Sequence, residues 1–335
     1  MSFKATTTPT LPFIDFTKTD DQLMKPGTPE WEALKSQVFA ASKDFGCFRA
    51  RFPDTPLQAA MAVTAQLKQL FDLPLETKQR NVSELPFGGF IGQSTFAPLY
   101  QSFGIDDPSS IDKLQSLTHA LLPENPSLSE TIRSFAKEVS AAEATIRVML
   151  LESLGIQKYK EEHLESSFDT LRFMKYDGIS EEEASDGEHK LGLNSHMDQD
   201  LMTVLYSNWA GELEIFTKDG RHWISSEATS DDFVVFVGES LHAWTNGRLH
   251  CPYHRVKVTG REVRYSAAVF TAFKVGYTVE APAELVDEEH PLLYKPFDHL
   301  DFLKLLERDA GKAYFGDELN AYTPLKAYYG ISPID

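Results

Sequence analysis

The sequence contains few of the features that mark secreted, membrane or nucleic-acid-binding proteins. Only two of its 335 residues are cysteine, Cys47 and Cys251, which excludes a disulfide framework and favours a reducing compartment. No stretch approaches the ~18 consecutive apolar residues of a membrane span, and residues 1–12 lack the apolar run of a signal peptide. Lys and Arg total 32 against 50 Asp and Glu, which gives a net charge of −18 without any basic cluster. These absences predict a soluble, cytoplasmic protein that binds neither nucleic acid nor anionic membranes.

The composition that remains is that of a globular protein with a sizeable core. Hydrophobic residues make up 42% of the chain and charged residues 24%, close to the averages for soluble domains. The length allows one large domain or two smaller ones. Because no repeat and no Gly/Ser/Pro-rich linker divides the sequence, we expect residues 1–335 to fold as a single unit, with a mainly helical part over residues 1–165.

Three helices are predicted in the first part. Thr28 and Pro29 form an N-cap followed by an N1 proline, and Gly46 supplies a left-handed stop. Residues 57–71 are the second candidate. The third begins at the capping-box pattern Ser127–Glu130 and ends at Gly155.

The second part, residues 166–335, has the pattern of an antiparallel β-protein with a C-terminal helix after Pro296. Asp219-Gly220 and Asn246-Gly247 are dipeptides typical of tight hairpins, whose central residues take positive φ. The acidic segment 180–188 lacks apolar periodicity and is predicted to be a solvated loop. Together these signals favour a β-sandwich or barrel. The strand-like runs are Leu201–Tyr206, Leu213–Phe216, Phe233–Val237 and Ser266–Phe270.

The strongest chemical signal is a histidine and an aspartate two residues apart, His196 and Asp198, just before a strand-like run. On an extended backbone, residues at this spacing face the same side. With His254 further along the chain they form a set of two imidazoles and one carboxylate. This set is typical of the facial triad that binds Fe(II) in non-haem oxygenases, although zinc accepts the same donors in a tetrahedral site.

A second pair of residues favours iron over zinc. Arg264 and Ser266 also share one face of a predicted strand, ten residues after His254. A guanidinium binds a carboxylate through two parallel hydrogen bonds, and a serine hydroxyl adds a third. The sequence provides no acidic partner near Arg264, so we expect the carboxylate to belong to a dicarboxylate co-substrate.

With these motifs in place, the chain resembles the plant-type 2-oxoglutarate- and Fe(II)-dependent dioxygenase superfamily over nearly its whole length. Within it, the sequence is most similar to the group of plant specialised metabolism that modifies glucosinolate side chains and steroidal alkaloids. The motifs that carry the resemblance are Leu11–Phe16, Phe45–Phe48, His196–Asp198, Asn246–Arg248, His254–Val256, Arg264–Ser266 and Leu285–Pro291.

The resemblance implies an α+β fold with a double-stranded β-helix (jelly-roll, cupin-like) core that forms a single catalytic unit. It also implies a monomer that requires Fe(II), 2-oxoglutarate and O₂. Ascorbate is implied as the reductant and a small molecule as the substrate. His196, Asp198 and His254 are implied as catalytic metal ligands, Arg264 and Ser266 as ligands of 2-oxoglutarate, and Tyr176 as a hydrogen-bond partner of the co-substrate. The chain departs from the family at Met174, where an asparagine is usual.

The substrate pocket is predicted from aromatic residues. Residues 85–103 are rich in Phe and Gly, which suits a flap over an apolar pocket, although packing alone explains the same composition. We expect hydroxylation, desaturation or dealkylation of a small, largely apolar plant metabolite. Two alternatives stay open: an iron oxidase of the same fold that does not use 2-oxoglutarate, and a non-catalytic small-molecule-binding relative. The pocket candidates are Phe87, Phe90, Phe96, Phe103, Phe270 and Phe273.

Overall fold

Two β-sheets and the helices around them make up the part of the chain that the computed structural model describes, residues 9–17, 25–95, 97–186, 189–313 and 324–331. The strands are β1 (Phe13–Asp15), β2 (Cys47–Arg51), β3 (Phe90–Ile91), β4 (Tyr100–Ile105), β5 (Ser167–Tyr176), β6 (Lys190–His196), β7 (Met202–Ser207), β8 (Glu212–Phe216), β9 (Trp223–Ser225), β10 (Phe233–Val237), β11 (His254–Val258), β12 (Arg264–Phe273), β13 (Thr278–Val279) and β14 (Phe297–Asp298). The helices are α1 (Pro29–Asp44), α2 (Asp54–Phe71), α3 (Leu75–Lys78), α4 (Ile111–Leu121), α5 (Leu128–Ser153), α6 (Lys160–Glu165), α7 (Glu181–Ser185), α8 (Glu239–Trp244), α9 (His299–Ala313) and α10 (Pro324–Tyr329), with short 3₁₀ turns η1 (Gln157–Tyr159) and η2 (Ala283–Leu285).

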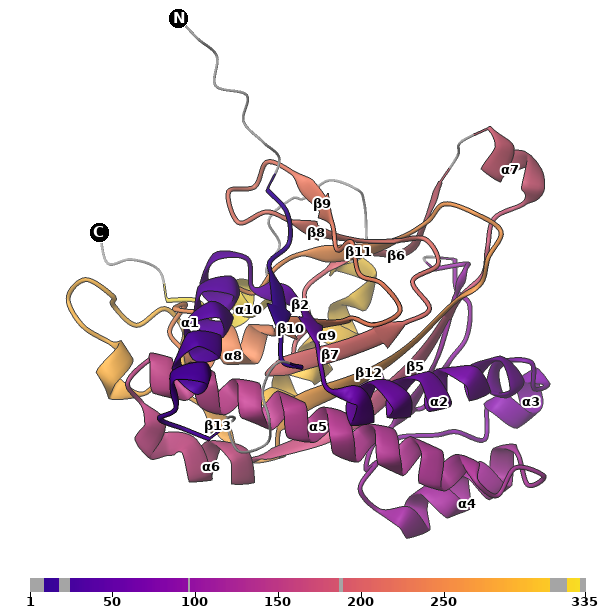
Figure 1. The fold of residues 1–335 in the computed structure, drawn as a ribbon, viewed down its shortest axis with the longest axis horizontal. Helices are drawn as coiled ribbons and strands as arrows, with labels where there is room; N and C mark the ends of the chain where they lie inside the picture. The colour runs from indigo at the N-terminus through magenta and orange to yellow at the C-terminus, as the bar shows by residue number, and fades with distance from the viewer. Residues whose placement is uncertain (1–8, 18–24, 96, 187–188, 314–323, 332–335) are drawn as a thin grey trace, which may run out of the picture.

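The large sheet has eight strands in the order β1-β2-β10-β7-β12-β5-β4-β3, and the small sheet has four in the order β6-β11-β8-β9. All neighbouring strands are antiparallel except β1 and β2. Of the four strands before residue 165, β2 pairs with β10 and β4 pairs with β5 of the second part, while β1 and β3 form the two edges of the large sheet. Figure 1 shows the small sheet beside the large one. This arrangement is the predicted α+β, jelly-roll architecture.

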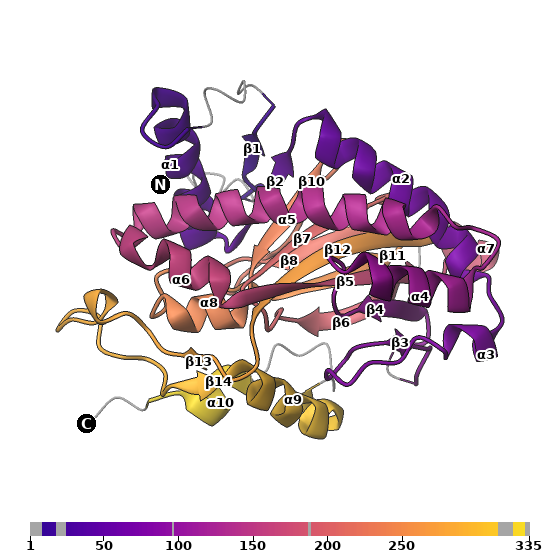
Figure 2. The ribbon, with the colours of Figure 1, turned by 90° about the horizontal axis from the view of Figure 1, so that it is seen from below.

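The large sheet separates two hydrophobic cores. Leu171 and Phe173 of β5 pack in the core under the helices, whereas Met174 and Tyr176 lie in the core between the sheets. This alternation follows from the period of two along a strand. Figure 2 shows α5 and α2 side by side along one face of the large sheet, and α9 on the opposite side of the strands.

The predicted helix ends are confirmed, with two local differences. The Thr28 hydroxyl accepts a hydrogen bond from the Trp31 amide at the start of α1. Gly46 and Gly155 follow α1 and α5 with φ near +72°, a conformation that glycine adopts without steric cost. The helix α2 begins at Asp54, before the predicted start at residue 57. Ser127 precedes α5 but does not cap it, because its backbone has helical rather than extended dihedral angles (φ −80°, ψ −11°); its hydroxyl donates to Asn125 Oδ1 (3.0 Å).

Three local predictions are wrong. Segment 180–188 contains the helix α7, which a capping box between Ser180 and Glu183 stabilises despite the lack of apolar periodicity. Asp219-Gly220 does join two strands, β8 and β9, but only Gly220 has positive φ. Asn246-Gly247 has positive φ at both residues, yet it closes the helix α8 rather than a hairpin.

No helix within the described ranges combines the length and the apolar character needed to cross a bilayer.

Candidate active site

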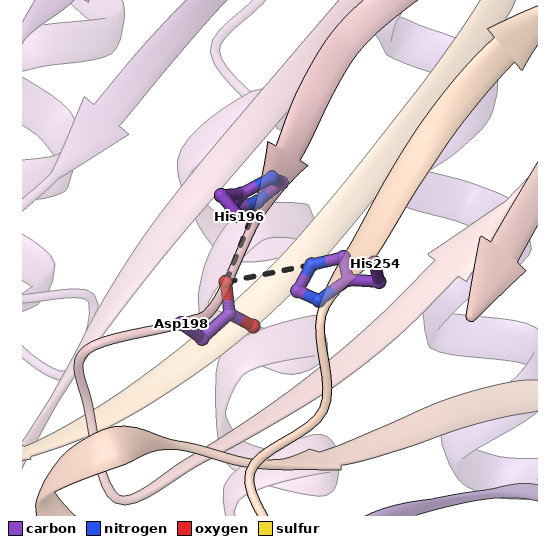
Figure 3. A group of neighbouring side chains, drawn as sticks. All are labelled: His196, Asp198 and His254. Atoms are coloured by element: carbon purple, nitrogen blue, oxygen red, sulfur yellow. Dashed lines mark ion pairs between the residues drawn. The ribbon is translucent and has the colours of Figure 1, made fainter. Parts of the chain in front are cut away.

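The structure brings His196, Asp198 and His254 together at the ends of two neighbouring strands of the small sheet. His196 is the last residue of β6 and pairs in register with His254, the first residue of β11, while Asp198 follows β6 directly. The Asp198 Oδ1 atom lies 3.7 Å from His196 Nε2 and 3.6 Å from His254 Nε2. Figure 3 shows both imidazole rings and the carboxylate pointing toward one another.

Both imidazoles are held with Nε2 facing this common point. His196 Nδ1 donates to the Asn194 carbonyl (2.8 Å) and His254 Nδ1 to the Pro252 carbonyl (3.4 Å). Because a carbonyl only accepts, each Nδ1 carries a proton, which leaves Nε2 as the nitrogen that a metal ion can bind. Burial, and then the neighbouring His196, lowers the pKa of His254 to about 4, so this ring is neutral at pH 7.

The three donors fit a divalent metal ion. Nitrogen and oxygen ligands about 2.1 Å from one ion lie roughly 3.0–3.4 Å apart at octahedral or tetrahedral angles. The observed separations of 3.6 and 3.7 Å need only small side-chain movements to reach this range. Two imidazole nitrogens and one carboxylate oxygen also have the donor chemistry of an Fe(II) site with open positions.

A hydroxyl and a second carboxyl group orient Asp198. Thr203 on β7 donates from Oγ1 to Asp198 Oδ2 (2.5 Å), and the same hydroxyl lies 3.1 Å from Asp200 Oδ2. Burial and the nearby Asp198 raise the pKa of Asp200, which favours its protonated, hydrogen-bond-donating form. The free oxygen of Asp198 is thereby directed toward the two histidines.

Arg264 lies in the core between the sheets with most of its donors unused. It is 2% exposed, and Nη1 donates to the Ala210 carbonyl (3.2 Å), whereas Nε and Nη2 have no partner in the described part of the chain. The guanidinium lies beside the rings of Tyr176 and Trp209, and the Trp209 indole nitrogen is likewise buried without a partner. Burial lowers the pKa of Arg264 to about 10, so the group stays charged at pH 7. Among the described residues no carboxylate forms an ion pair with it, so the position fits an incoming anion.

Ser266, Met174 and Tyr176 lie around this arginine on the same interior face. Ser266 pairs in register with Met174 across β12 and β5, and its hydroxyl donates to Ser207 Oγ (3.2 Å). The buried Tyr176 hydroxyl lies 3.6 Å from the Met174 sulfur, a weak acceptor. The expected hydrogen bond from Tyr176 to a co-substrate stays a prediction.

A cavity of about 460 Å³ opens between the sheets and reaches His196 and Asp198. Its walls come from the segment before β4, from the interior faces of β5 and β12, and from α9. Most of the lining side chains are apolar, and the volume lies within the ~300–1,000 Å³ typical of small-molecule sites.

The aromatic pocket predictions divide into two groups. Phe87, Phe270 and Phe273 line the cavity. Phe90 and Phe103 do not, so their prediction as lining residues is wrong: their rings pack against each other at 5.0 Å, and Phe103 lies in the core under the helices. Phe96 lies outside the described residues.

Sequence reasoning missed two cavity residues on β5. Phe168 and Arg172 precede Met174 at even spacing, a signal that the alternation of the strand already contained. His299, the first residue of α9, also lines the cavity and forms a hydrogen bond with Ser240 Oγ through Nδ1 (2.9 Å).

Known families match both parts of the chain. The 2OG-Fe(II) oxygenase superfamily matches residues 168–272, and a domain described as "non-haem dioxygenase in morphine synthesis N-terminal" matches residues 11–101.

Individual proteins match over almost the full length. A probable 2-oxoglutarate-dependent dioxygenase of Arabidopsis thaliana, AOP1.2, is 42% identical over 90% of this chain and 92% of its own. The 2-oxoglutarate-dependent dioxygenase AOP3 of the same plant is 30% identical over 97% of this chain and 98% of its own. The crystal structure of a rice dioxygenase for auxin oxidation superposes with a TM-score of 0.72 at 28% identity, covering 90% of this chain and 96% of that one.

These similarities confirm the predicted resemblance, the reaction class and the use of Fe(II) and 2-oxoglutarate. The chain belongs to the 2OG-Fe(II) oxygenase superfamily and is a 2-oxoglutarate-dependent dioxygenase of the plant type.

Proposed function

We propose that this enzyme couples oxidation of a small, largely apolar plant metabolite to the conversion of 2-oxoglutarate and O₂ into succinate and CO₂. His196, Asp198 and His254 hold Fe(II), and Arg264 with Ser266 binds the distal carboxylate of 2-oxoglutarate. Hydroxylation is the expected outcome, with desaturation or oxidative dealkylation as variants of the same chemistry. The whole chain acts as one catalytic unit.

The observation that carries this assignment is the buried Arg264, whose Nε and Nη2 atoms have no hydrogen-bond partner among the described residues. A buried cation without a counter-charge costs several kcal/mol, unless a ligand provides the missing anion. A dicarboxylate fits because one carboxylate can pair with the guanidinium while the other end reaches toward the three metal-binding side chains. A monoanion bound only to Arg264 would have no second carboxylate to reach the metal-binding side chains.

The chain's own residues bind and orient the reactants. Arg264 and Ser266 fix one end of 2-oxoglutarate, and the rings of Tyr176 and Trp209 keep water away from the guanidinium. The hydrogen bonds from Nδ1 of His196 and His254 to backbone carbonyls direct both Nε2 atoms at one point. Bound Fe(II) supplies the one-electron chemistry that activates O₂.

The cavity supports the proposed substrate class. Apolar walls such as Phe168, Leu193 and Phe270 bind ligands by removing apolar area from water. The rice relative is described as a dioxygenase for auxin oxidation, which is also oxidation of a small molecule. The net charge of −18 argues against nucleic acid and anionic membranes as partners. We further propose a monomeric, cytoplasmic enzyme of specialised metabolism that uses ascorbate to keep its iron reduced.

An anaerobic titration tests the assignment. Fe(II) and 2-oxoglutarate added to the protein should give a weak visible charge-transfer band, and air should then start a slow decay of 2-oxoglutarate to succinate. Replacement of His196, Asp198 or His254 by Ala should abolish both signals. His222→Ala is the matched control, because this exposed histidine lies in the turn between β8 and β9, and its signals should equal those of the wild type.

Two outcomes would contradict the proposal. A band that forms with Fe(II) alone and does not respond to 2-oxoglutarate would favour an iron oxidase with another reductant. The absence of any band, together with no 2-oxoglutarate decay in the presence of a metabolite panel, would favour a non-catalytic binding protein.

A further inference from the structure

Two arginines in the interior of the β-core lack an acidic partner. Among the described residues, every arginine except Arg80, Arg172 and Arg264 has a carboxylate within ion-pair distance. Arg80 is exposed and needs no counter-charge, because water solvates it. Arg264 is assigned to 2-oxoglutarate. Arg172 is therefore the partly buried arginine that, among the described residues, has no acidic partner and no role in the proposed chemistry.

Arg172 lies on the wall of the ligand cavity. It is part of β5, two residues before Met174, and its register partners are Gly104 on β4 and Ala268 on β12. Nη1 donates to Ser102 Oγ (2.9 Å), and Nη2 donates to the Phe87 carbonyl. Both acceptors are neutral, so the positive charge is oriented but not compensated.

The charges around the cavity do not neutralise Arg172. Of the described residues, no lysine lines the cavity, and the acidic lining residues are Asp106, Asp198 and Asp200. Asp106 accepts the Ser83 hydroxyl (2.7 Å) and forms no ion pair with Arg172, while Asp198 and Asp200 share the Thr203 hydroxyl at the metal-binding end. A lone, partly buried cation among apolar walls is stabilised most by a ligand that brings an oxyanion.

We propose that Arg172 binds an oxyanion of the main substrate, a carboxylate or a sulfate, and so selects acids over neutral molecules of the same shape. This inference rests on the proposed function, because it names the substrate class of that cavity. The apolar body of the substrate then lies against the apolar walls of the cavity, to which Phe168 and Phe270 belong, and the same cavity reaches His196. The hydrogen bond to the Phe87 carbonyl links the same guanidinium to the segment that covers the cavity.

Calorimetric titration of the anaerobic protein loaded with Fe(II) and 2-oxoglutarate tests the selection. The probes are phenylacetate, 3-phenylpropanoate and indole-3-acetate, each with its neutral primary amide, and phenyl sulfate, which distinguishes a sulfate from a carboxylate. At least one oxyanion should bind the wild type about 10- to 100-fold more tightly than its neutral counterpart, as expected for a charged hydrogen bond. Arg172→Gln should remove this preference, and Arg172→Lys should retain part of it.

Two variants separate recognition from a merely structural role. Arg80→Gln removes an exposed arginine that donates only to the Ala120 carbonyl, and it should leave the acid-over-amide preference unchanged. Ser102→Ala removes one neutral partner of Arg172 but keeps the charge, so the preference should persist. If Arg172 only held the segment around Phe87 in place, Arg172→Gln would weaken the binding of acids and of amides to the same extent.

The proposal is overturned if no acid in the panel binds better than its amide, or if the preference survives in Arg172→Gln. Slow 2-oxoglutarate decay without any probe is measured in parallel. Loss of that decay in the wild type would contradict the proposed function, whereas normal decay without acid preference would contradict only the role of Arg172.

Discussion

Replacement of Arg264 by Lys tests the assignment of the co-substrate site most directly. In the wild type Nη1 is occupied by the Ala210 carbonyl, which leaves Nε and Nη2 as the donors for a carboxylate. A lysine ammonium keeps the charge but loses the planar fork, so at least one charged hydrogen bond disappears. Such a bond contributes about 1.5–3 kcal/mol. We therefore expect the KM for 2-oxoglutarate to rise roughly 10- to 150-fold.

The assay is succinate formation at increasing 2-oxoglutarate concentration, with the visible band of the anaerobic complex as an independent measure of binding. Ser266→Ala should raise the same KM only about 2- to 10-fold, because it removes a neutral hydrogen bond. Arg255→Lys is the matched control. Arg255 pairs with Glu214 in the small sheet (2.8 Å), so its replacement should leave the KM for 2-oxoglutarate unchanged.

Three results would contradict the assignment of Arg264 to 2-oxoglutarate. An unchanged KM in Arg264→Lys would show that the guanidinium does not bind the co-substrate. An equal effect of Arg255→Lys would indicate a general electrostatic change rather than a specific contact. A fall in the unfolding temperature that accounts for the lost activity would assign Arg264 a role in folding only.

Three further predictions concern the metal, the co-substrate and the core. Fe(II) should raise the unfolding temperature of the wild type and a chelator should reverse this, whereas Asp198→Ala should show neither effect in a thermal melt, because an ion stabilises only a protein that binds it. Met174→Asn should lower the KM for 2-oxoglutarate about 2- to 10-fold, since an amide donates where a thioether cannot; a higher KM in saturation kinetics would contradict this. Phe103→Ala should lower the free energy of unfolding by about 3–5 kcal/mol without changing substrate preference. Phe87→Ala should change substrate preference with little loss of stability. Denaturant titrations measure the stability of each variant, and a metabolite panel measures its substrate preference.

Local patterns predicted much of the secondary structure correctly, because the interactions behind them are short in sequence. The Thr28 cap depends on an amide three residues away, and Gly155 on the backbone conformation of a single residue. The same kind of pattern led to a wrong prediction where one local conformation occurs both in a hairpin turn and at a helix end. Asn246-Gly247 has the positive φ values of a hairpin, but the chain uses them to end α8. The helix α7 was missed because a capping box holds it without an apolar face.

The chemistry of the site follows from local patterns in the sequence. His196 and Asp198 share one strand end, and Arg264 and Ser266 share one strand face, so a period of two places each pair together. Which side of each strand faces the cavity depends on tertiary packing. Phe103 and Ser102 are adjacent on β4, and a register shift of one residue would exchange their faces. The pairing of β6 with β11 joins His254 to the other two metal-binding residues, and a contact this distant in sequence leaves no local pattern.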